Sequence, residues 1–329
     1  MGSKKAYWII GAVALLLIAV VAALPQLRSP VRKPTVPQKI STPSQVSLSP
    51  EVKKYKEEPV ITLYRHKNNS VQRIPLEKYL MGVVAAEIGT NQPTEALKAQ
   101  AIAARSLVMS RIAYLGGAKM HKTNACDLPE HFQAYDETKV TDAIRNAVNA
   151  TRGQVITYNG KFAYALFHSY SWKKTASIEE YFPEQRKLAG GYIKSVSSPG
   201  EEYAPAKERH WRVSIPHSEL QSIFGPKADL NAIKITKRGP SGRALDISAG
   251  SKTVKAYDLR TRLGGERLKS TMITKITSNG NNTIFEGYGW GHGCGLSQWG
   301  AYAMAKQGRN SLAIVTHYYS GTRVVKLWK

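Results

Sequence analysis

The sequence predicts an α+β protein, in which a helical lobe and a β-rich lobe form a cleft and one N-terminal transmembrane helix precedes them. Apolar residues recur at helical spacing over residues 74–112, which predicts the helical lobe. Short β-rich runs separated by turn residues occur from residue 154 to residue 286, which predicts the β-rich lobe. An uncharged, apolar run at residues 7–24 predicts the membrane span.

The composition is that of a folded protein with a strongly basic charge. The chain has 329 residues, enough for about two domains, of which 42% are hydrophobic and 21% charged. It has 47 lysines and arginines against 23 acidic residues, a net charge of +24. This charge excludes an ordinary near-neutral cytosolic enzyme and favours a polyanionic neighbour such as nucleic acid, anionic lipid or cell wall. Two cysteines exclude a disulfide framework.

The N-terminal segment predicts attachment to a membrane. As a helix, residues 7–24 would span about 27 Å, near the thickness of a hydrocarbon core. A cleaved signal peptide is the alternative, but the apolar run is longer than the usual signal core. Basic residues flank both ends of the run, so the positive-inside rule leaves its orientation open.

A proline-rich linker is expected after the span. Six prolines lie between positions 25 and 50, among serine, threonine, glutamine and lysine, a composition typical of an extended spacer. The predicted organisation is therefore a short basic N-terminus (1–6), an anchor (7–24), a linker (25–59) and a folded region (60–329).

The folded region is expected to begin with a strand at residues 60–64 and a helix over 74–88. Leu76 and Leu80 begin an apolar stripe on that helix, and the stripe continues to Glu87. A carboxylate in that position either reaches solvent or a cation, or lies in an apolar pocket. Burial in such a pocket raises the pKa of the carboxyl group, which suits it to general-acid catalysis.

A second helix is expected over residues 93–112. Its many alanines allow another helix or a ligand to approach closely. Lys98 and Arg105 are seven residues apart and therefore lie on one face, two turns from each other. Either cation is a candidate partner for Glu87.

The strongest local prediction is a β-hairpin over residues 154–168, because Asn159 and Gly160 separate two β-rich runs. Later strands are expected at 211–215, 232–236, 244–248, 253–256, 273–277 and 283–286. Later helices are expected at 218–224, 257–263, 296–307 and 311–318.

A glycine-rich segment over residues 287–301 is the second candidate site. Every other residue from 287 to 295 is glycine, so an extended backbone would present Tyr288, Trp290, His292 and Cys294 on one face. Such a face could bind a flat ring. The alternative is a tight crossing of two backbones. The spacing matches neither a P-loop nor a dinucleotide-binding fingerprint.

A metal site is a weaker candidate. His121, Cys126 and His131 lie within eleven residues and carry zinc-binding atoms, but no fourth soft ligand lies nearby in the sequence. A surface loop with an inert thiol is the favoured interpretation, so no cofactor is expected. Hydroxyl groups in residues 168–175, together with Lys194, are expected to line a polar cleft.

These segments resemble the stage II sporulation protein D family, membrane-anchored lytic transglycosylases of spore-forming bacteria. The matching stretches are residues 79–87, 95–105, 150–153, 192–196, 289–301 and 317–322. The resemblance extends from about residue 60 to the C-terminus and implies cleavage of peptidoglycan glycan strands between N-acetylmuramic acid and N-acetylglucosamine. It implies an extracytoplasmic, single-pass protein that works beside a cell-wall amidase and a membrane scaffold during forespore engulfment.

The resemblance also assigns roles to residues. Glu87 falls at the position of the family's catalytic acid, and Lys98, Arg105, Tyr192 and Lys194 match positions of its cleft. With the segments above, the predicted substrate-binding residues are Lys98, Arg105, Ser169, Tyr192, Lys194, Trp290, His292 and Gln298.

The chain departs from the family pattern at three places. Trp172 and Lys173 stand where the family usually has two glycines, which predicts a bulkier cleft wall. Phe132 stands where some zinc-binding relatives have a second cysteine. Cys294 replaces an aliphatic residue in the glycine-rich segment.

Three alternatives remain. A hydrolase would need a second carboxylate, and Asp127, Asp136, Glu179 and Glu180 are unassigned. A cell-wall-binding scaffold on the same fold would use Glu87 structurally. A nucleic-acid binder would explain the charge, but no recognisable nucleic-acid-binding motif is present, so no nucleic-acid partner is expected.

Overall fold

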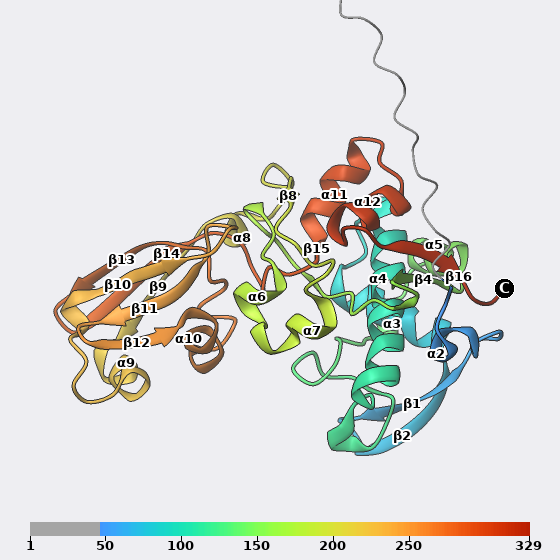
Figure 1. Cartoon of the computed structure of the whole chain (residues 1–329), viewed down its shortest axis with the longest axis horizontal. Helices are drawn as coiled ribbons and strands as arrows, with labels where there is room; N and C mark the ends of the chain where they lie inside the picture. Colours follow the sequence, from blue (N-terminus) through green and yellow to red (C-terminus); the bar gives the residue numbers. More distant parts are fainter. Residues whose placement is uncertain (1–46) are drawn as a thin grey trace, which may run out of the picture. The chain divides into compact units, whose positions relative to one another are not determined.

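The computed structural model describes residues 47–329 (Figure 1). The predicted span at 7–24 and most of the predicted linker lie outside the described residues. Within residues 47–329, no helix combines the length and the apolar character needed to cross a membrane.

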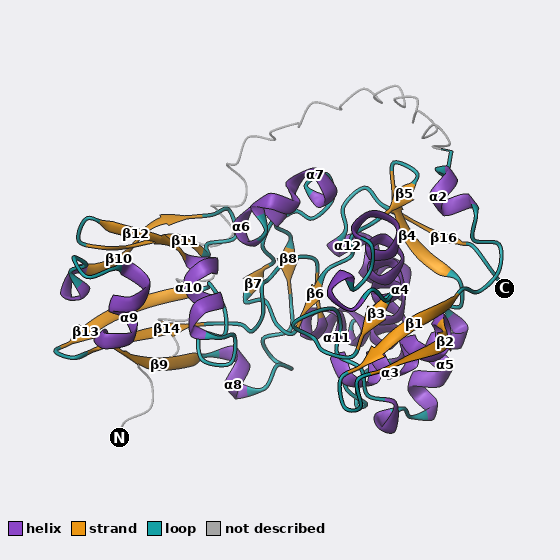
Figure 2. Ribbon diagram, turned by 90° about the horizontal axis from the view of Figure 1, so that it is seen from below, coloured by secondary structure: helices purple, strands orange, loops and turns teal. Residues whose placement is uncertain are grey.

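The described residues form two hydrophobic cores. The long helices and the two antiparallel sheets lie in different parts of the chain, as predicted, which confirms the α+β class (Figure 2). The helices before residue 200 are α2 (Pro50–Lys53), α3 (Leu76–Glu87), α4 (Thr94–Leu115), α5 (Asp142–Ala150), α6 (Ile178–Tyr181) and α7 (Arg186–Ala189). The strands there are β1 (Val60–Arg65), β2 (Ser70–Pro75), β3 (Ala125–Cys126), β4 (Gln154–Tyr158), β5 (Lys161–Phe162), β6 (Phe167–His168), β7 (Lys173–Lys174) and β8 (Ser197–Ser198).

The β-rich lobe and the C-terminal elements follow. The helices are α8 (Ala206–Arg209), α9 (His217–Phe224), α10 (Ala256–Leu263), α11 (Gln298–Lys306) and α12 (Ser311–Tyr318). The strands are β9 (Trp211–Pro216), β10 (Ile233–Arg238), β11 (Ala244–Ala249), β12 (Lys252–Lys255), β13 (Ile273–Asn279), β14 (Asn282–Gly287), β15 (Leu296–Ser297) and β16 (Arg323–Lys326).

Helix α4 is the centre of the first core. It packs against α3, α5, α11, α12 and β4. Ala101 and Ala104 are fully buried, so these neighbours can approach its backbone closely, as its alanine content predicts. Gly116 directly follows the last residue of α4 and has φ of +74°, a left-handed conformation that glycine adopts without steric cost, so it closes the helix.

The second core lies between two three-stranded sheets. Their strand orders are β10-β11-β12 and β13-β14-β9, and all the pairs are antiparallel. Trp211, Ile247 and Phe285 are buried there, and α9 and α10 contribute Leu220 and Leu259. Six strands and two helices predicted for this lobe are confirmed within two residues at each end.

The structure also differs from the prediction, most clearly in three places. The β1 strand is followed by a second strand, β2, in an antiparallel hairpin that the sequence analysis missed. The turn at Asn159 and Gly160 is confirmed, with both φ angles positive, but residues 161–168 do not form one strand. Instead β6 leaves the hairpin and pairs in parallel with β15, 128 residues later in the chain.

The third difference concerns the start of the folded region. Val52 is fully buried, and the Ser49 N–H donates to the Gly160 carbonyl at 2.9 Å. Residues 47–59 therefore belong to the first core and not to the extended linker that was expected to reach residue 59, because Val52 removes apolar surface from water there.

Candidate functional site

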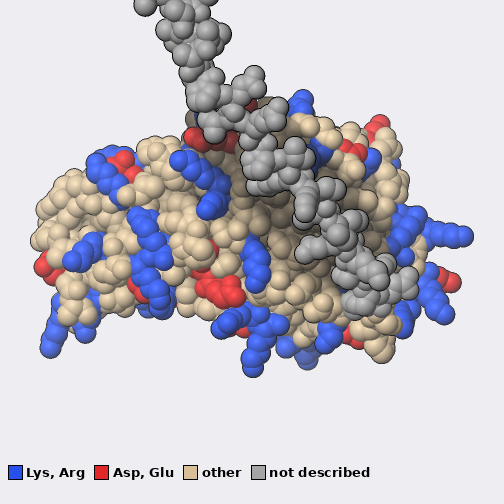
Figure 3. Space-filling view, turned by 45° about the horizontal axis from the view of Figure 1, so that its top comes forward, with Lys and Arg blue, Asp and Glu red and all other residues tan. Residues whose placement is uncertain are grey.

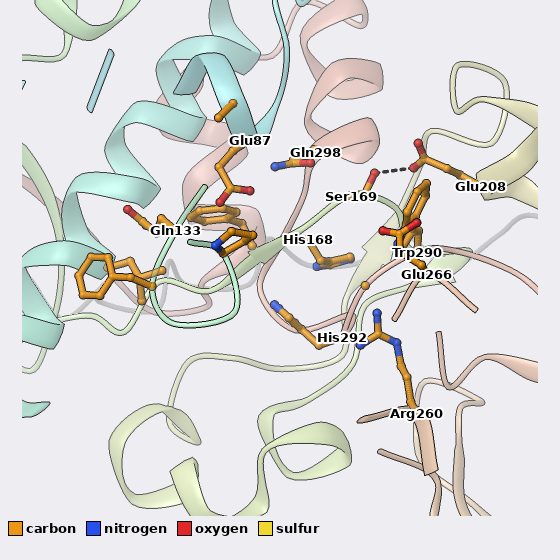
Figure 4. Close-up of a pocket in the computed structure, with 16 residues that line it drawn as sticks. Glu87, Gln133, His168, Ser169, Glu208, Arg260, Glu266, Trp290, His292 and Gln298 are labelled. Atoms are coloured by element: carbon orange, nitrogen blue, oxygen red, sulfur yellow. Dashed lines mark hydrogen bonds between the residues drawn. The ribbon is translucent and has the colours of Figure 1, made fainter. Parts of the chain in front are cut away.

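A cleft of about 590 Å³ brings together residues from both lobes (Figure 4). Its polar and charged lining residues are Glu87, Gln133, His168, Ser169, Glu208, Arg260, Glu266, His292 and Gln298. Trp290, Phe132, Phe167 and Leu107 supply apolar surface. In Figure 4 the carboxyl group of Glu87 points into the cleft, and the guanidinium group of Arg260 points into it from the β-rich lobe.

Glu87 is the last residue of α3 and is half-buried against apolar surface. Its Oε1 accepts a hydrogen bond of 2.7 Å from the Ala134 N–H, and it forms no ion pair within residues 47–329. Burial raises the pKa of Glu87 to about 7, and the Ala134 hydrogen bond opposes this shift only in part. The group is therefore a carboxyl that can hold a proton near neutral pH, as a general acid must.

Arg105 does not contact the cleft, which corrects the prediction that it binds substrate. Its side chain is fully buried and forms an ion pair of 2.6 Å with Glu77, which is 2% exposed. The Trp328 Nε1–H and the Gly153 N–H both donate to the same carboxylate at 3.0 Å. A buried cation is stable only with such a partner, and the partner of Arg105 is Glu77, not Glu87 as was considered from the sequence.

The other three predicted residues outside the cleft have local partners. Lys98 pairs with Glu95 three residues earlier on α4, at 2.8 Å. Tyr192 is 2% exposed, and its hydroxyl accepts the Tyr164 N–H at 2.6 Å. Lys194 is exposed and donates to the Gly190 carbonyl at 2.5 Å. None of these side chains lines the cleft, although the sequence placed all of them in it.

Four predicted binding residues do line the cleft together with Glu87. They are Ser169, Trp290, His292 and Gln298. Gln298 begins α11, and Ser169 directly follows β6, so two segments that are 129 residues apart meet here. Burial lowers the pKa of His292 to about 3, with the Arg260 charge contributing, so this imidazole is neutral at physiological pH.

The glycine-rich segment is not extended, so its side chains do not share one face as predicted. Gly289 and Gly291 have φ of +80° and +109°, and a Cβ on Gly291 would lie 2.7 Å from the Cβ of His168. The glycines allow this backbone to cross residues 166–170 closely, which is the alternative that the sequence left open. Trp290 reaches the cleft, whereas Cys294 is fully buried.

Two carboxylates of the cleft were missed. Glu208 on α8 is 7% exposed and accepts a hydrogen bond from the Ser169 hydroxyl, and burial raises its pKa. Glu266 lies in the loop after α10. Neither lies in a recognisable motif, so only the fold brings them near Glu87. The four carboxylates left unassigned by the sequence, Asp127, Asp136, Glu179 and Glu180, do not line the cleft.

A cluster of metal-binding atoms lies beside this site. His66, His121, Cys126 and His131 each offer one ligand atom, and these atoms all lie within 4.8 Å of one another. His66, which directly follows β1, supplies the fourth group that the sequence around Cys126 lacks, since β3 pairs in parallel with β1.

The chemistry of this cluster fits zinc. The Nε2 of His66 is buried without a hydrogen-bond partner, while its Nδ1 lies 2.5 Å from Asp127 Oδ1. A carboxylate on one ring nitrogen leaves the other for the metal, which is the usual arrangement of zinc-binding histidines. Imidazole nitrogen and thiolate sulfur are both preferred zinc ligands, and the four groups match the four ligands of a tetrahedral site.

Comparison with known proteins gives consistent matches. A family model described as stage II sporulation protein matches residues 64–158. The chain is 35% identical to stage II sporulation protein D of Bacillus amyloliquefaciens over 284 residues, which are 82% of this chain and 80% of that protein. For the protein of the same name in Bacillus subtilis, identity is 34% over 279 residues, 80% of this chain and 78% of that protein. The amidase enhancer of Bacillus subtilis is 25% identical over 74% of this chain and 40% of its own length.

Proposed function

This chain belongs to the stage II sporulation protein D family, and on that premise we propose that it is a lytic transglycosylase of peptidoglycan. Its substrate is the β-1,4 bond between N-acetylmuramic acid and N-acetylglucosamine, in glycan strands freed of their stem peptides. The observation that supports this activity is Glu87, whose pKa of about 7 lets one carboxyl group give up and recover a proton in a cleft.

The reaction needs Glu87 twice. Its carboxyl group first donates a proton to the glycosidic oxygen as the bond to C1 of muramic acid breaks. The resulting carboxylate then takes the proton of the muramic acid C6 hydroxyl, whose oxygen bonds to C1 and gives a 1,6-anhydro end. Trp290 offers an aromatic surface to the sugar rings, and Ser169, His292 and Gln298 offer hydrogen-bonding groups.

We propose that zinc is held by His66, His121, Cys126 and His131. Bound there, the metal would supply structural cross-linking of β1 to the loop that follows β3. That loop carries Ala134, whose N–H holds the Glu87 carboxyl group in position.

The cellular setting follows from the same premise. Residues 7–24 anchor the protein as a single span, and the catalytic region lies outside the cytoplasm, between mother cell and forespore. The net charge of +24 suits an anionic wall polymer, and basic side chains are spread over the face drawn in Figure 3. The similarity to a protein named amidase enhancer supports work beside a cell-wall amidase.

A digest of glycan strands tests the activity. The whole chain is incubated with peptide-free strands and with intact peptidoglycan, and the products are analysed by mass spectrometry. We expect products about 18 Da lighter than hydrolysed ones, because cyclisation replaces the attack of water. Hydrated reducing ends would identify a hydrolase instead. Binding of both substrates without cleavage would favour the second candidate, a cell-wall-binding scaffold in which Glu87 is structural.

A further inference from the structure

A second groove lies on the surface of the chain, and it shares no lining residue with the cleft of Glu87. Its volume is about 440 Å³, and Trp172, Lys173, Lys174 and Arg238 line it. No acidic residue lines it, and none of its three cations forms an ion pair within the described residues. Uncompensated positive charge around a hollow favours an anionic ligand.

One buried acid, Glu180, lies next to the groove, because it accepts hydrogen bonds from Ser241, which lines the groove. Glu180 is 3% exposed and accepts hydrogen bonds from both the backbone N–H and the hydroxyl of Ser241, at 3.1 and 2.6 Å. Its carboxylate therefore already accepts hydrogen bonds from within the protein, and it does not line the groove.

Aromatic rings stand at one wall of the groove. Trp172 stacks on Tyr288 with ring centroids 4.4 Å apart, and the Lys173 Nζ lies 4.2 Å from the centroid of the Trp172 ring. His210 packs edge-on against Tyr288 at 5.1 Å. Stacked aromatic rings beside the exposed Lys173 and Lys174 offer both an apolar platform and a counter-charge.

The backbone of Lys173 is strained. Its φ is +61°, in the left-handed region that glycine occupies freely and other residues enter at a cost. The chain nevertheless has lysine there, exposed to solvent and without an ion-pair partner in the part of the chain that the structure describes. Such an outlier suggests that the side chain serves a purpose other than folding.

The groove and the cleft are built on the same two segments. Tyr170 and Trp290 form two backbone hydrogen bonds with each other, at 2.9 and 3.0 Å. Ser169 and Trp290 face the cleft, whereas Trp172 lines the groove and stacks on Tyr288. Ser169 and Trp172 are three positions apart in the sequence, which is about 10 Å of extended chain.

We propose that this groove binds a further stretch of an anionic glycan strand, outside the segment held at Glu87. In the complex a sugar ring packs on Trp172 and displaces the Lys173 side chain from that ring. The carboxylates of the strand then pair with Lys173, Lys174 and Arg238. This inference rests on the proposed function for the identity of the glycan. Its role is to retain the strand, since it shares no lining residue with the cleft that holds Glu87.

Binding to the full-length Glu87→Gln chain in mild detergent tests the proposal, since that variant leaves the strand uncut. Calorimetry is run with peptide-free glycan strands, which bear a muramic carboxylate on every second sugar, and with uncharged N-acetylglucosamine oligomers. We expect tighter binding of the charged strands, weakened by salt. Adding Trp172→Ala or Lys173→Gly is expected to lower that affinity about fivefold.

Two controls keep the result interpretable. Lys173→Gly relieves the positive φ, so its melting temperature should equal or exceed that of the parent, and weaker binding then reflects the lost side chain. Lys174→Gln is matched with Lys234→Gln, an exposed lysine on β10, which should leave affinity unchanged. The proposal would be overturned if Lys174→Gln and Lys234→Gln changed the affinity for charged strands equally. It would also be overturned if the Trp172 and Lys173 variants bound those strands as tightly as the parent, or if the protein bound duplex DNA more tightly than glycan. If the groove variants weaken glycan binding but the parent chain cleaves no glycan, the proposed activity is wrong while the proposed binding site is supported.

Discussion

The N–H of Ala134 donates a hydrogen bond of 2.7 Å to Oε1 of Glu87. The loop that follows β3 therefore contacts the carboxyl group at the end of α3. The same loop carries His131 of the candidate metal cluster, and it begins directly after Cys126, the cluster's thiol, at the end of β3. The other oxygen of Glu87 has no protein partner within residues 47–329 and is free to hold a proton. This arrangement links loop position, metal binding and the acid in one short chain of contacts.

Replacement of Glu87 by glutamine is expected to stabilise the protein in a pH-dependent way. The pKa of Glu87 is raised to about 7 in the folded chain, so the protonated group stabilises the fold fully below about pH 4 and that contribution is lost as the pH rises through 7. At pH 8, Glu87→Gln should raise the free energy of unfolding by about 2 to 3 kcal/mol, and at pH 4 by almost nothing. Urea unfolding at the two pH values measures this, with the exposed Glu202→Gln as control. Equal effects at both pH values would contradict the burial of Glu87.

The pH dependence of glycan cleavage is expected to follow the same group. A general acid works only while protonated, so the rate should fall as the pH rises through about 7. Initial rates on peptide-free strands between pH 5 and 9 give the profile. A rate that keeps rising to pH 9 would exclude Glu87 as the proton donor.

Replacement of Arg105 by methionine is expected to destabilise the fold, not merely to reduce activity. The change leaves the Glu77 carboxylate buried beside Trp328 without its cation, which costs about 3 to 5 kcal/mol. Adding Glu77→Gln should recover part of the loss. Denaturant unfolding of the single and double variants measures both values. If the Arg105→Met variant is as stable as the parent but no longer binds glycan, Arg105 binds substrate after all.

Replacement of His66 by alanine is expected to abolish tight zinc binding, because three ligands remain of the four that lie together. Zinc content after dialysis, and the thiolate absorption of the cobalt-loaded protein, measure the site without reference to activity. The matched control is His210→Ala, an exposed histidine outside the cluster. Full zinc content in the His66 variant would show that His121, Cys126 and His131 suffice.

Replacement of Glu208 by glutamine distinguishes two reaction types. In the proposed cyclisation Glu87 is the only acid and base, so the variant should still form 1,6-anhydro ends, at a rate within about tenfold of the parent. A glycoside hydrolase needs a second carboxylate, and Glu208 is a buried acid in the same cleft. Complete loss of cleavage in a variant that still folds would therefore favour hydrolysis.

The sequence by itself determined the local elements and the residue at the centre of the cleft. The stripe that begins at Leu76 and Leu80 predicts α3, and the interruption of that stripe by a carboxylate singles out Glu87, because helical periodicity is a local property. The Asn159–Gly160 turn and the six strands of the β-rich lobe follow from the same kind of short-range signal.

Only the tertiary structure decided which charged and metal-binding groups meet. Arg105 pairs with Glu77 on a neighbouring helix instead of lining the cleft, His66 joins a cluster some sixty residues away through the pairing of β1 with β3, and Glu208 reaches the cleft from another lobe. Such contacts join residues that are far apart in the sequence, so they produce no local periodicity from which they could be predicted. A buried charge must find its partner in space, and one sequence alone does not reveal which partner that is.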